Sequence, residues 1–294
     1  MKTNPASEFA VHFWGVRGSI PSPGPETVRY GGNTSCVEMI VAGRRLIFDG
    51  GTGLRMLGKQ LLQESPQDVF MFFTHYHWDH IQGIPFFLPA FGEDTCFHIH
   101  GQVPPEDGDM KMAQHFRDRV LHLNAPVPVA EIHAEMKFHD LVCGEIFDFE
   151  GIHIETQMLN HPNGAMGYRV SWNGYTAVYC TDTEHFPDRL DERVLELAHD
   201  ADIFIYDAMY TDEEYHNPKS PKVGWGHSTW QEGVKVAKAA GVKQLVVFHH
   251  EPNHSDDFLD RLAEEVTVTM PGSVLAREGL TLDLTRQPVE AAKA

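Results

Sequence analysis

The stretch Thr74-His75-Tyr76-His77-Trp78-Asp79-His80 places four side chains that can bind metal ions within six residues. It directly follows the apolar run 69–73, which has the composition of a buried strand. Along an extended chain His75 and His77 project to the same face, and a turn into a helix brings Asp79 and His80 to a neighbouring point. The motif therefore predicts two adjacent metal sites built from one short loop.

The ligand types indicate which metals to expect. Imidazole suits zinc, iron and similar divalent ions, while a carboxylate extends the choice toward harder ions such as manganese. The alternative is a surface loop rich in histidine, in a chain that carries 19 histidines. The dense spacing favours the metal sites. We expect two divalent ions, with Zn or Mn preferred and Fe as a further option.

Composition and charge exclude several classes of protein. The 294 residues are 42% hydrophobic and 22% charged, which is ordinary globular usage. No run approaches the ~18 apolar residues of a membrane helix, and no basic segment followed by an apolar stretch opens the chain. The cysteines form no C-x-x-C pair and resemble small buried hydrophobes of a reducing compartment. We expect a cytoplasmic protein with no membrane partner.

The net charge bears on the substrate. With 23 basic and 42 acidic residues, the formal charge is -19. Such a surface would repel a nucleic-acid backbone, so a long DNA or RNA partner is disfavoured. A small anionic substrate drawn to the metals remains compatible with this charge.

Apolar patterns and turn signals predict strands and helices in two successive groups. Strands are expected at 9–16, 36–41, 45–49, 69–73, 145–149, 152–159, 167–172, 176–181, 203–207 and 244–249, and helices at 54–62, 191–198 and 230–240. Two halves, each with strands and then helices, predict two sheets packed face to face with helices outside. We expect one domain from 8 to 285, followed by a flexible tail at 286–294.

Residues 92–140 look less regular than the rest. They contain Pro104-Pro105, Pro126 and Pro128, and an amphipathic segment near 110–121. We interpret this stretch as a lid or specificity insertion, with a plain surface excursion as the alternative.

The helix expected at 230–240 has clear end signals. Ser228 or Thr229 can cap its first turn, and Thr229-x-x-Glu232 matches a capping box. Gly241 stands where a C-terminal glycine belongs. The N-terminus of this helix therefore lies beside His227.

Three further candidate ligands follow predicted strands: His161, Asp182 and His249. Each one alone is more often structural, but strand ends are where open α/β folds place their chemistry. Together with the 74–80 motif, these residues give the ligand order H-x-H-x-D-H, His, Asp, His. This order resembles that of the metallo-β-lactamase superfamily, and the resemblance extends from Phe9 to Leu284. His250 follows His249 directly, and on one strand the two face opposite ways, so only one can enter the site.

The resemblance implies an α/β fold, a four-layer αββα sandwich, with a dinuclear metal site. One metal would take His75, His77 and His161, the other would take Asp79, His80 and His249, and Asp182 would bridge them. His249 is preferred from its place in similar family members, with His250 as the fallback. A shared anion between two close cations agrees with general metal chemistry.

Two later segments resemble the ribonuclease Z branch of the superfamily. Residues 201–210 resemble the segment that ends there in an acidic residue, and Gly226-His227-Ser228-Thr229 resembles the histidine motif that follows. The resemblance implies that His227 contacts the scissile phosphate or protonates the leaving oxygen and that Asp207 orients it. The catalytic residues expected are thus His227, Asp207 and Asp79. The alternative for His227 is a helix-flanking residue in a surface loop.

The opening segments 14–21 and 30–36 resemble a bacterial subgroup of phosphodiesterases with this fold. Much of their glycine is expected to serve turns. Asn33 could approach the site, and Asp49 is expected to support the metal loop rather than to bind a metal. The sequence leaves the roles of His185 and His254 open.

One departure from ribonuclease Z narrows the substrate. His161 and Asp182 are too close in sequence to hold the long arm by which ribonuclease Z grips transfer RNA in that interval. We therefore expect a dinuclear-metal phosphodiesterase that hydrolyses a small diester through a metal-bridging hydroxide, with a cyclic nucleotide or cyclic dinucleotide preferred. Dimers are common in similar proteins, so a homodimer is also expected.

Two other functions stay open. A hydrolase of carbonyl esters, such as a thioester or lactam, could use the same metals, although Asp182 instead of Cys in the bridging position argues against the common lactamases. A non-hydrolytic metal-binding or redox module is the second. Flavo-diiron proteins of this fold usually carry Glu where His77 stands and attach a flavodoxin domain, and both signs are missing.

Overall fold

The structure is a computed structural model, and it describes residues 8–64, 68–93, 95–103, 107–108, 110–121 and 133–285. The predicted tail at 286–294 lies outside these residues, as do Pro104, Pro105, Pro126 and Pro128 of the predicted insertion. Within the described residues, no helix is long and apolar enough to cross a bilayer.

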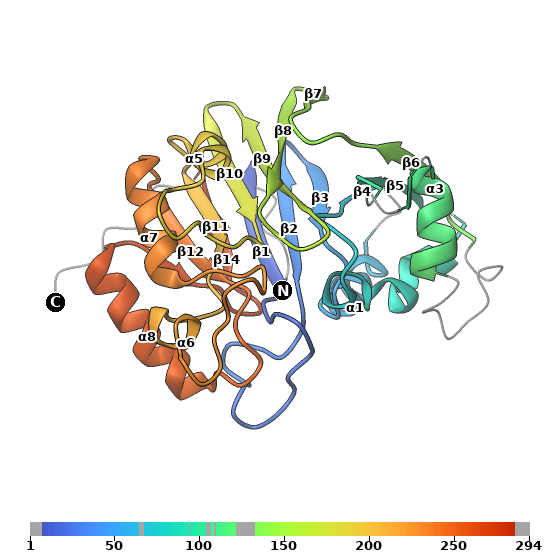
Figure 1. The fold of residues 1–294 in the computed structure, drawn as a ribbon. Coiled ribbons are helices and arrows are strands. Elements are labelled where there is room, and N and C mark those ends of the chain that lie inside the picture. Colours follow the sequence, from blue (N-terminus) through green and yellow to red (C-terminus); the bar gives the residue numbers. More distant parts are fainter. Residues whose placement is uncertain are drawn as a thin grey trace, which may run out of the picture.

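Two mixed sheets of seven strands each form the centre of the molecule (Figure 1). The first has the order β14-β1-β2-β3-β4-β5-β6. Its strands are β1 (Phe9–Gly15), β2 (Cys36–Val41), β3 (Arg44–Phe48), β4 (Val69–Phe72), β5 (Cys96–Gly101), β6 (Glu135–Asp140) and β14 (Thr281–Asp283). The second has the order β13-β12-β11-β10-β9-β8-β7. Its strands are β7 (Ile146–Phe149), β8 (Ile152–Leu159), β9 (Ala165–Trp172), β10 (Tyr175–Cys180), β11 (Ile203–Asp207), β12 (Gln244–Phe248) and β13 (Val274–Leu275).

The two sheets share one internal pattern. In the first, β14, β1, β2 and β3 pair antiparallel, and β3 through β6 pair parallel. In the second, β7 through β10 pair antiparallel, and β10 through β13 pair parallel. The change from antiparallel to parallel pairing occurs at β3 and at β10. Parallel strands need crossover connections, and helices between β3 and β4, between β10 and β11 and between β11 and β12 supply them.

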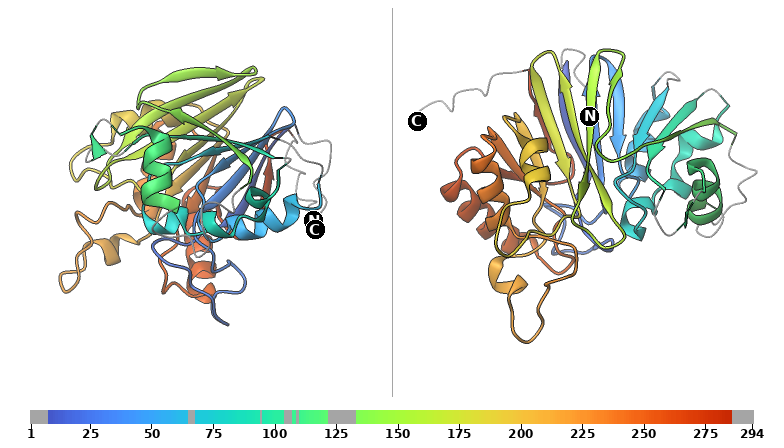
Figure 2. Two further views of the ribbon diagram at one scale, coloured as in Figure 1. Left: turned by 90° about the vertical axis from the view of Figure 1, so that its right-hand side faces the viewer. Right: turned by 45° about the horizontal axis from the view of Figure 1, so that its top comes forward.

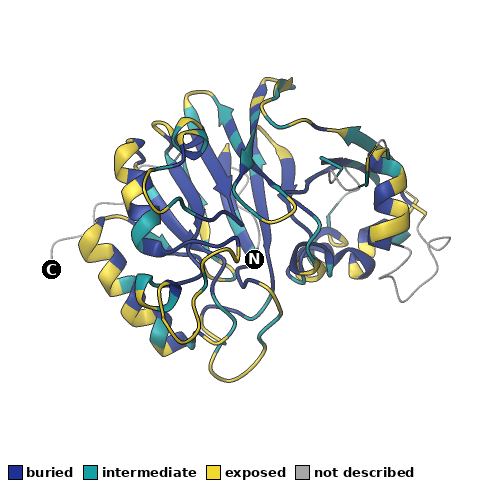
Figure 3. Cartoon of the chain, in the orientation of Figure 1, coloured by how far each residue is buried: buried dark blue, intermediate teal, exposed yellow. Residues whose placement is uncertain are grey.

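Three hydrophobic clusters separate four layers. The middle cluster joins the facing sides of the sheets, where the ring of Phe48 stacks on Phe72 at 5.3 Å and meets Tyr168 edge-on at 5.4 Å. Helix α1 (Leu54–Leu61) contributes Leu54 and Leu57 to a second cluster on the outer face of the first sheet. The third lies on the outer face of the second sheet, under α5 (Glu192–Ala198), α7 (Trp230–Ala239) and α8 (Asp256–Thr269). Buried strands between helices with exposed outer faces are visible in Figure 3. The predicted αββα sandwich is confirmed.

Short helical segments complete the chain. They are α2 (Trp78–Ile81), α3 (Met112–His115), α6 (Asp212–Tyr215), the 3-10 helices at Ile84–Phe86 and Leu88–Phe91, and a π-helix at Phe116–Leu121. The N-cap of α7 is Thr229, whose hydroxyl accepts from the backbone N–H of Glu232 at 3.2 Å. Gly241 follows α7 with a φ of 71°, the left-handed conformation of a helix C-terminus. The predicted cap at Thr229 and the C-terminal glycine are therefore confirmed, whereas the Glu232 carboxylate pairs with Lys235.

The prediction of irregular structure across 92–140 is wrong in part. β5 and β6 lie in this stretch and extend the first sheet by parallel pairing. Their strand signal is weak because histidines alternate with apolar residues in β5, and β6 is partly exposed along its length. The role of the remainder as a lid stays a prediction, as do the domain limits 8 and 285.

Candidate metal-binding active site

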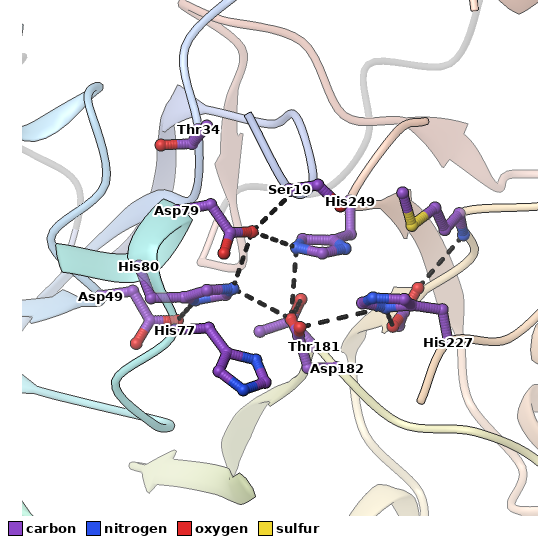
Figure 4. Close-up of polar contacts among 12 residues, drawn as sticks. Ser19, Thr34, Asp49, His77, Asp79, His80, Thr181, Asp182, His227 and His249 are labelled. Carbon is purple, nitrogen blue, oxygen red and sulfur yellow. Dashed lines mark hydrogen bonds and ion pairs between the residues drawn. The ribbon is translucent and has the colours of Figure 1, made fainter. Parts of the chain in front are cut away.

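The predicted ligands meet at one edge of the two sheets. Figure 4 shows His77, Asp79, His80, Asp182 and His249 among them. The first loop follows β4, and His161, Asp182 and His249 follow β8, β10 and β12. These strands come from both sheets, and their carboxyl ends converge on this edge, where α/β folds place ligands.

One group of donors surrounds the His75 side of the site. Ligand atoms of His75, His77, His161 and Asp182 all lie within 4.8 Å of one another. The Nδ1 of His77 and the Nε2 of His161 face each other at 3.0 Å. The Asp182 Oδ2 lies 3.6 Å from the Nε2 of His75 and 3.7 Å from that of His161. Three ring nitrogens and one carboxylate oxygen thus converge on one point.

A second group lies beside the first. Ligand atoms of Asp79, His80 and His249 also lie within 4.8 Å of one another. The Oδ2 of Asp79 is 3.3 Å from the Nε2 of His80 and 3.2 Å from the Nε2 of His249. The other oxygen of Asp182, Oδ1, lies 3.1 Å from His80 Nε2 and 3.2 Å from His249 Nε2. The two Asp182 oxygens therefore face different groups, as a bridging carboxylate requires.

The donor set fits divalent cations by its chemistry. The Nε2 atoms of His75 and His80 are buried and have no aligned hydrogen-bond partner, which is unusual for a polar atom without a ligand. Burial lowers the pKa of His75 well below its usual value, so this ring offers a free lone pair. Burial would raise the pKa of the Asp79 and Asp182 carboxyls, but the surrounding histidines hold both well below the usual range. Neutral imidazoles and ionised carboxylates are the forms that bind metals.

Buried residues behind the ligands fix their orientation. Asp49 Oδ1 accepts from the backbone N–H of Thr74 at 2.8 Å, and its Oδ2 lies 2.8 Å from the Nδ1 of His80 and accepts from the hydroxyl of Tyr179 at 3.0 Å. Asp49 thus supports the metal loop, as expected. The Nδ1 of His161 lies 2.8 Å from the carbonyl oxygen of Gly226. Such contacts set which ring nitrogen faces a metal.

Left-handed backbone conformations occur at four non-glycine residues of this site. The φ values are 62° at Ser19, 60° at Asp49, 58° at Asp182 and 63° at His249. This conformation is costly for L-residues and gathers at functional sites. At His249 it turns the chain just after β12, so that the ring enters the site while His250 points away. The Nε2 of His250 lies 2.7 Å from the Ala276 carbonyl oxygen.

His227 and Asp207 form a pair next to the metal groups. The Nδ1 of His227 lies 2.8 Å from the Oδ2 of Asp207, and 3.9 Å from the Oδ2 of Asp182. Asp207 is fully buried and also accepts from the backbone N–H groups of Met209 and Thr183. Burial alone would lower the pKa of His227, but the nearby carboxylates, Asp207 first, raise it to about 9. The pair can therefore deliver a proton at neutral pH.

Two further contributors were not predicted from local sequence pattern. The loop of Gly18 and Ser19 crosses His249, and the backbone N–H of Ser19 donates to Asp79 Oδ2 at 2.8 Å. A Cβ on Gly18 would lie 2.7 Å from the His249 ring, so the close approach requires glycine. The buried Glu184 accepts from the backbone N–H groups of Gly224 and Gly226, close to His227. Both contacts join residues far apart in the chain, and only the folded structure reveals them.

The residues with open roles lie outside the ligand groups. Asn33 donates to Glu278 at 3.0 Å through its amide. The Nδ1 of His185 lies 2.9 Å from the Ser228 hydroxyl, and the Nε2 of His254 lies 2.8 Å from Glu214 Oε1. All three therefore contact other segments of the chain rather than either group of ligands.

Two hollows flank the site. One, of about 390 Å³, is lined by His75, His77, Asn163 and residues of the 107–120 region. The other, of about 500 Å³, is lined by His227, Tyr210, Trp225 and parts of the Ser19 and Asn253 loops. Each is large enough for part of a small ligand.

Comparison with known proteins identifies the family. Residues 44–250, more than half of the chain, match the family described as beta-lactamase superfamily domain, and the chain belongs to this superfamily. It is 25% identical to ribonuclease Z of Lachnospira eligens (strain ATCC 27750) over 92% of this chain and 96% of that protein. The predicted class, a metal-dependent hydrolase with similarity to ribonuclease Z, is confirmed.

Solved structures show the same fold. Zn²⁺-bound PqqB from Methylobacterium extorquens has a TM-score of 0.71 at 15% identity, covering 94% of this chain and 100% of that one. The short form of human tRNase Z has a TM-score of 0.64 at 20% identity, with coverages of 94% and 100%. At these identities the likeness extends to the fold alone.

Proposed function

We propose that this hydrolase is a phosphodiesterase that cleaves a small diester, with a cyclic nucleotide or cyclic dinucleotide as the substrate class. The observation that carries the proposal is the buried His227–Asp207 pair, whose ring lies 3.9 Å from the carboxylate that faces both ligand groups. A proton donor beside a paired metal site suits a reaction that must expel an alkoxide.

We propose that two divalent ions, Zn or Mn preferred, bind to the two donor groups with Asp182 between them. When bound, such ions supply Lewis acidity toward phosphoryl oxygens and make water a stronger nucleophile at neutral pH. The chain contributes the rest. Asp49 and Gly226 orient His80 and His161, and Asp182 and Asp79 balance the cationic charge.

His227 would hold its proton toward the leaving oxygen of the diester. Its Nδ1 is engaged by Asp207, so its remaining ring nitrogen is the one available to substrate in the hollow that His227 lines. With its pKa raised to about 9, the ring is protonated at neutral pH. Thioester hydrolysis, one form of the second candidate, releases a thiolate, which is a better leaving group than an alkoxide and needs this proton less.

The small size of the substrate rests on geometry and charge. From His161 to Asp182 the chain runs through a tight turn, β9, a second tight turn at Asn173-Gly174 and β10, so no arm for a large RNA emerges there. The net charge of -19 also opposes a long polyanion. The ribonuclease Z relative makes precursor tRNA the competing substrate. A homodimer stays a prediction.

The test compares substrates with measured metal content. Protein stripped of metal and reloaded with Mn²⁺ or Zn²⁺ should cleave bis(p-nitrophenyl) phosphate and at least one of the 2′,3′-cyclic, 3′,5′-cyclic or cyclic dinucleotides. Absence of cleavage with either metal would overturn the proposal. Faster turnover of a thioester would favour the carbonyl-ester function, and efficient trimming of precursor tRNA would favour the ribonuclease.

A further inference from the structure

An exposed tryptophan stands beside the proposed proton donor. Trp225 is 55% exposed and lines the same hollow as His227. The segment that carries it, from α6 to Gly226, projects from the body of the molecule (Figure 2). A single exposed apolar residue is ordinary on a protein surface, so its significance depends on how it is held.

The backbone on both sides of Trp225 is anchored. The backbone N–H of Gly224 donates to Glu184 Oε1 at 2.6 Å, and that of Gly226 donates to Glu184 Oε2 at 2.8 Å. The hydroxyl of Tyr215 donates to the same buried carboxylate. Because one fixed anion binds the backbone on each side of the indole, little conformational freedom is left for a ligand to remove.

The backbone conformation at both positions favours glycine. Gly224 and Gly226 have φ values of 84° and 85°, in the left-handed region. A Cβ on Gly226 would lie 2.3 Å from the Nδ1 of His161, whose position depends on the Gly226 carbonyl. The position of Trp225 is therefore coupled to a metal ligand on one side and to His227 on the other.

The hollow that Trp225 lines has both apolar and polar walls. It measures about 500 Å³ and is lined by exposed Ile20 and by the polar side chains of Glu251 and Asn253. The Lys222 ammonium lies 4.1 Å from the centre of a Trp225 ring. An aromatic side chain, an aliphatic side chain and polar groups that line one hollow match the apolar faces and the hydrogen-bonding rim of a nucleobase.

We propose that this hollow binds the nucleobase of the substrate, which stacks on Trp225. The inference rests on the proposed phosphodiesterase function and deepens it, because it restricts the diester to a nucleotide and assigns Trp225 to specificity. Trp225 touches the base and not the reacting atoms. Its loss should therefore affect substrates that carry a base and spare those that lack one.

The test uses Trp225→Ala, Trp225→Phe and the control Val223→Ala. Val223 is 61% exposed on the same loop and does not line the hollow. With metal-loaded enzyme, Trp225→Ala should raise KM for 2′,3′-cyclic AMP about 10-fold, the loss expected for one stacked base. The kcat/KM for glycerol 1,2-cyclic phosphate, which has no base, should stay within about twofold. Trp225→Phe should retain most of the affinity.

A binding measurement separates this inference from the proposed function. Titration calorimetry with AMP should show about 10-fold weaker binding to Trp225→Ala than to Val223→Ala, whether or not the wild type cleaves a diester. Equal AMP affinity in the two variants would overturn the inference, and so would equal losses on the two cyclic diesters. Wild-type protein that binds AMP through Trp225 but cleaves neither bis(p-nitrophenyl) phosphate nor any of the cyclic nucleotides and cyclic dinucleotides would overturn the phosphodiesterase proposal alone.

Discussion

Replacing Asp207 by Asn should lower the pKa of the proposed proton donor, His227. The substitution keeps the size of the side chain and removes the charge that lies 2.8 Å from the Nδ1 of His227. The pKa of His227 stands at about 9 instead of 6.5 because Asp207 outweighs the effect of burial. At about 1.4 kcal/mol per pH unit, this difference favours the protonated ring by about 3 kcal/mol. Without Asp207, burial should bring the pKa below about 7.

The leaving group of the substrate makes the loss measurable. A cyclic nucleotide expels an alkoxide that needs a proton, whereas bis(p-nitrophenyl) phosphate expels a stable phenolate. At pH 8, Asp207→Asn should lower kcat on the cyclic nucleotide ~10²-fold or more, as expected for the loss of general acid catalysis, and change the p-nitrophenyl reaction far less. The NMR titration of His227 in metal-free protein checks the pKa directly.

The matched control is Asp202→Asn. Asp202 directly precedes β11, whereas Asp207 ends it, and Asp202 pairs with Lys243. The control should leave both reactions unchanged.

The contribution of His227 to stability has a defined sign, because its pKa is raised on folding. It is complete below pH about 6.5 and is lost as pH rises through about 9. Equal losses on both substrates would refute the proton-donor role and leave His227 as a binding residue.

Three further predictions address the ligands and the loops. Asp182→Ala should lower the bound metal from two equivalents toward one or none, measured by elemental analysis, because both of its oxygens face ligand groups. Gly226→Ala should weaken metal binding through His161, since the added Cβ would lie 2.3 Å from Nδ1, and the circular dichroism spectrum should show that the fold is kept. Burial would raise the pKa of Glu214, but the hydrogen bond with His254 lowers it below its usual 4.5. The ionised Glu214 therefore contributes stability that is present above pH 4.5 and is lost as pH falls through the lowered pKa. Urea unfolding of Glu214→Gln should lack this step.

The sequence predicts the parts of the site that local pattern determines. The strand before His75 is an unbroken apolar run, and the ligand motif follows it directly. Both the strand and the metal-binding site can therefore be predicted from local sequence. β8 and β11 begin and end at the predicted residues, because alternating or continuous apolar residues meet turn signals at each end. The cap at Thr229 is equally local, since its partner lies three residues away.

Other features depend on contacts that no local pattern encodes. Glu184 is one acidic residue in a loop, and its hydrogen-bond donors lie more than 30 residues later in the chain. The choice between His249 and His250 depends on a left-handed turn at the end of β12, which the alternation of a strand does not anticipate. Helix α8 is absent from the predicted elements although its sequence carries a local signal: Ser255 caps it, and Leu259, Leu262 and Val266 form its buried stripe.

The segment 224–229 explains why these separate features act as one site. Its Gly226 carbonyl orients the metal ligand His161, its His227 carries the proton, and its Trp225 faces the hollow proposed for the base. Glu184 binds the segment at its start, and the Thr229 cap binds it to α7 at its end. A shift at either anchor would displace all three groups together. Because a misplacement of ~1 Å can cost ~10² in rate, the buried anchor Glu184 should matter to turnover as much as a residue that touches the substrate.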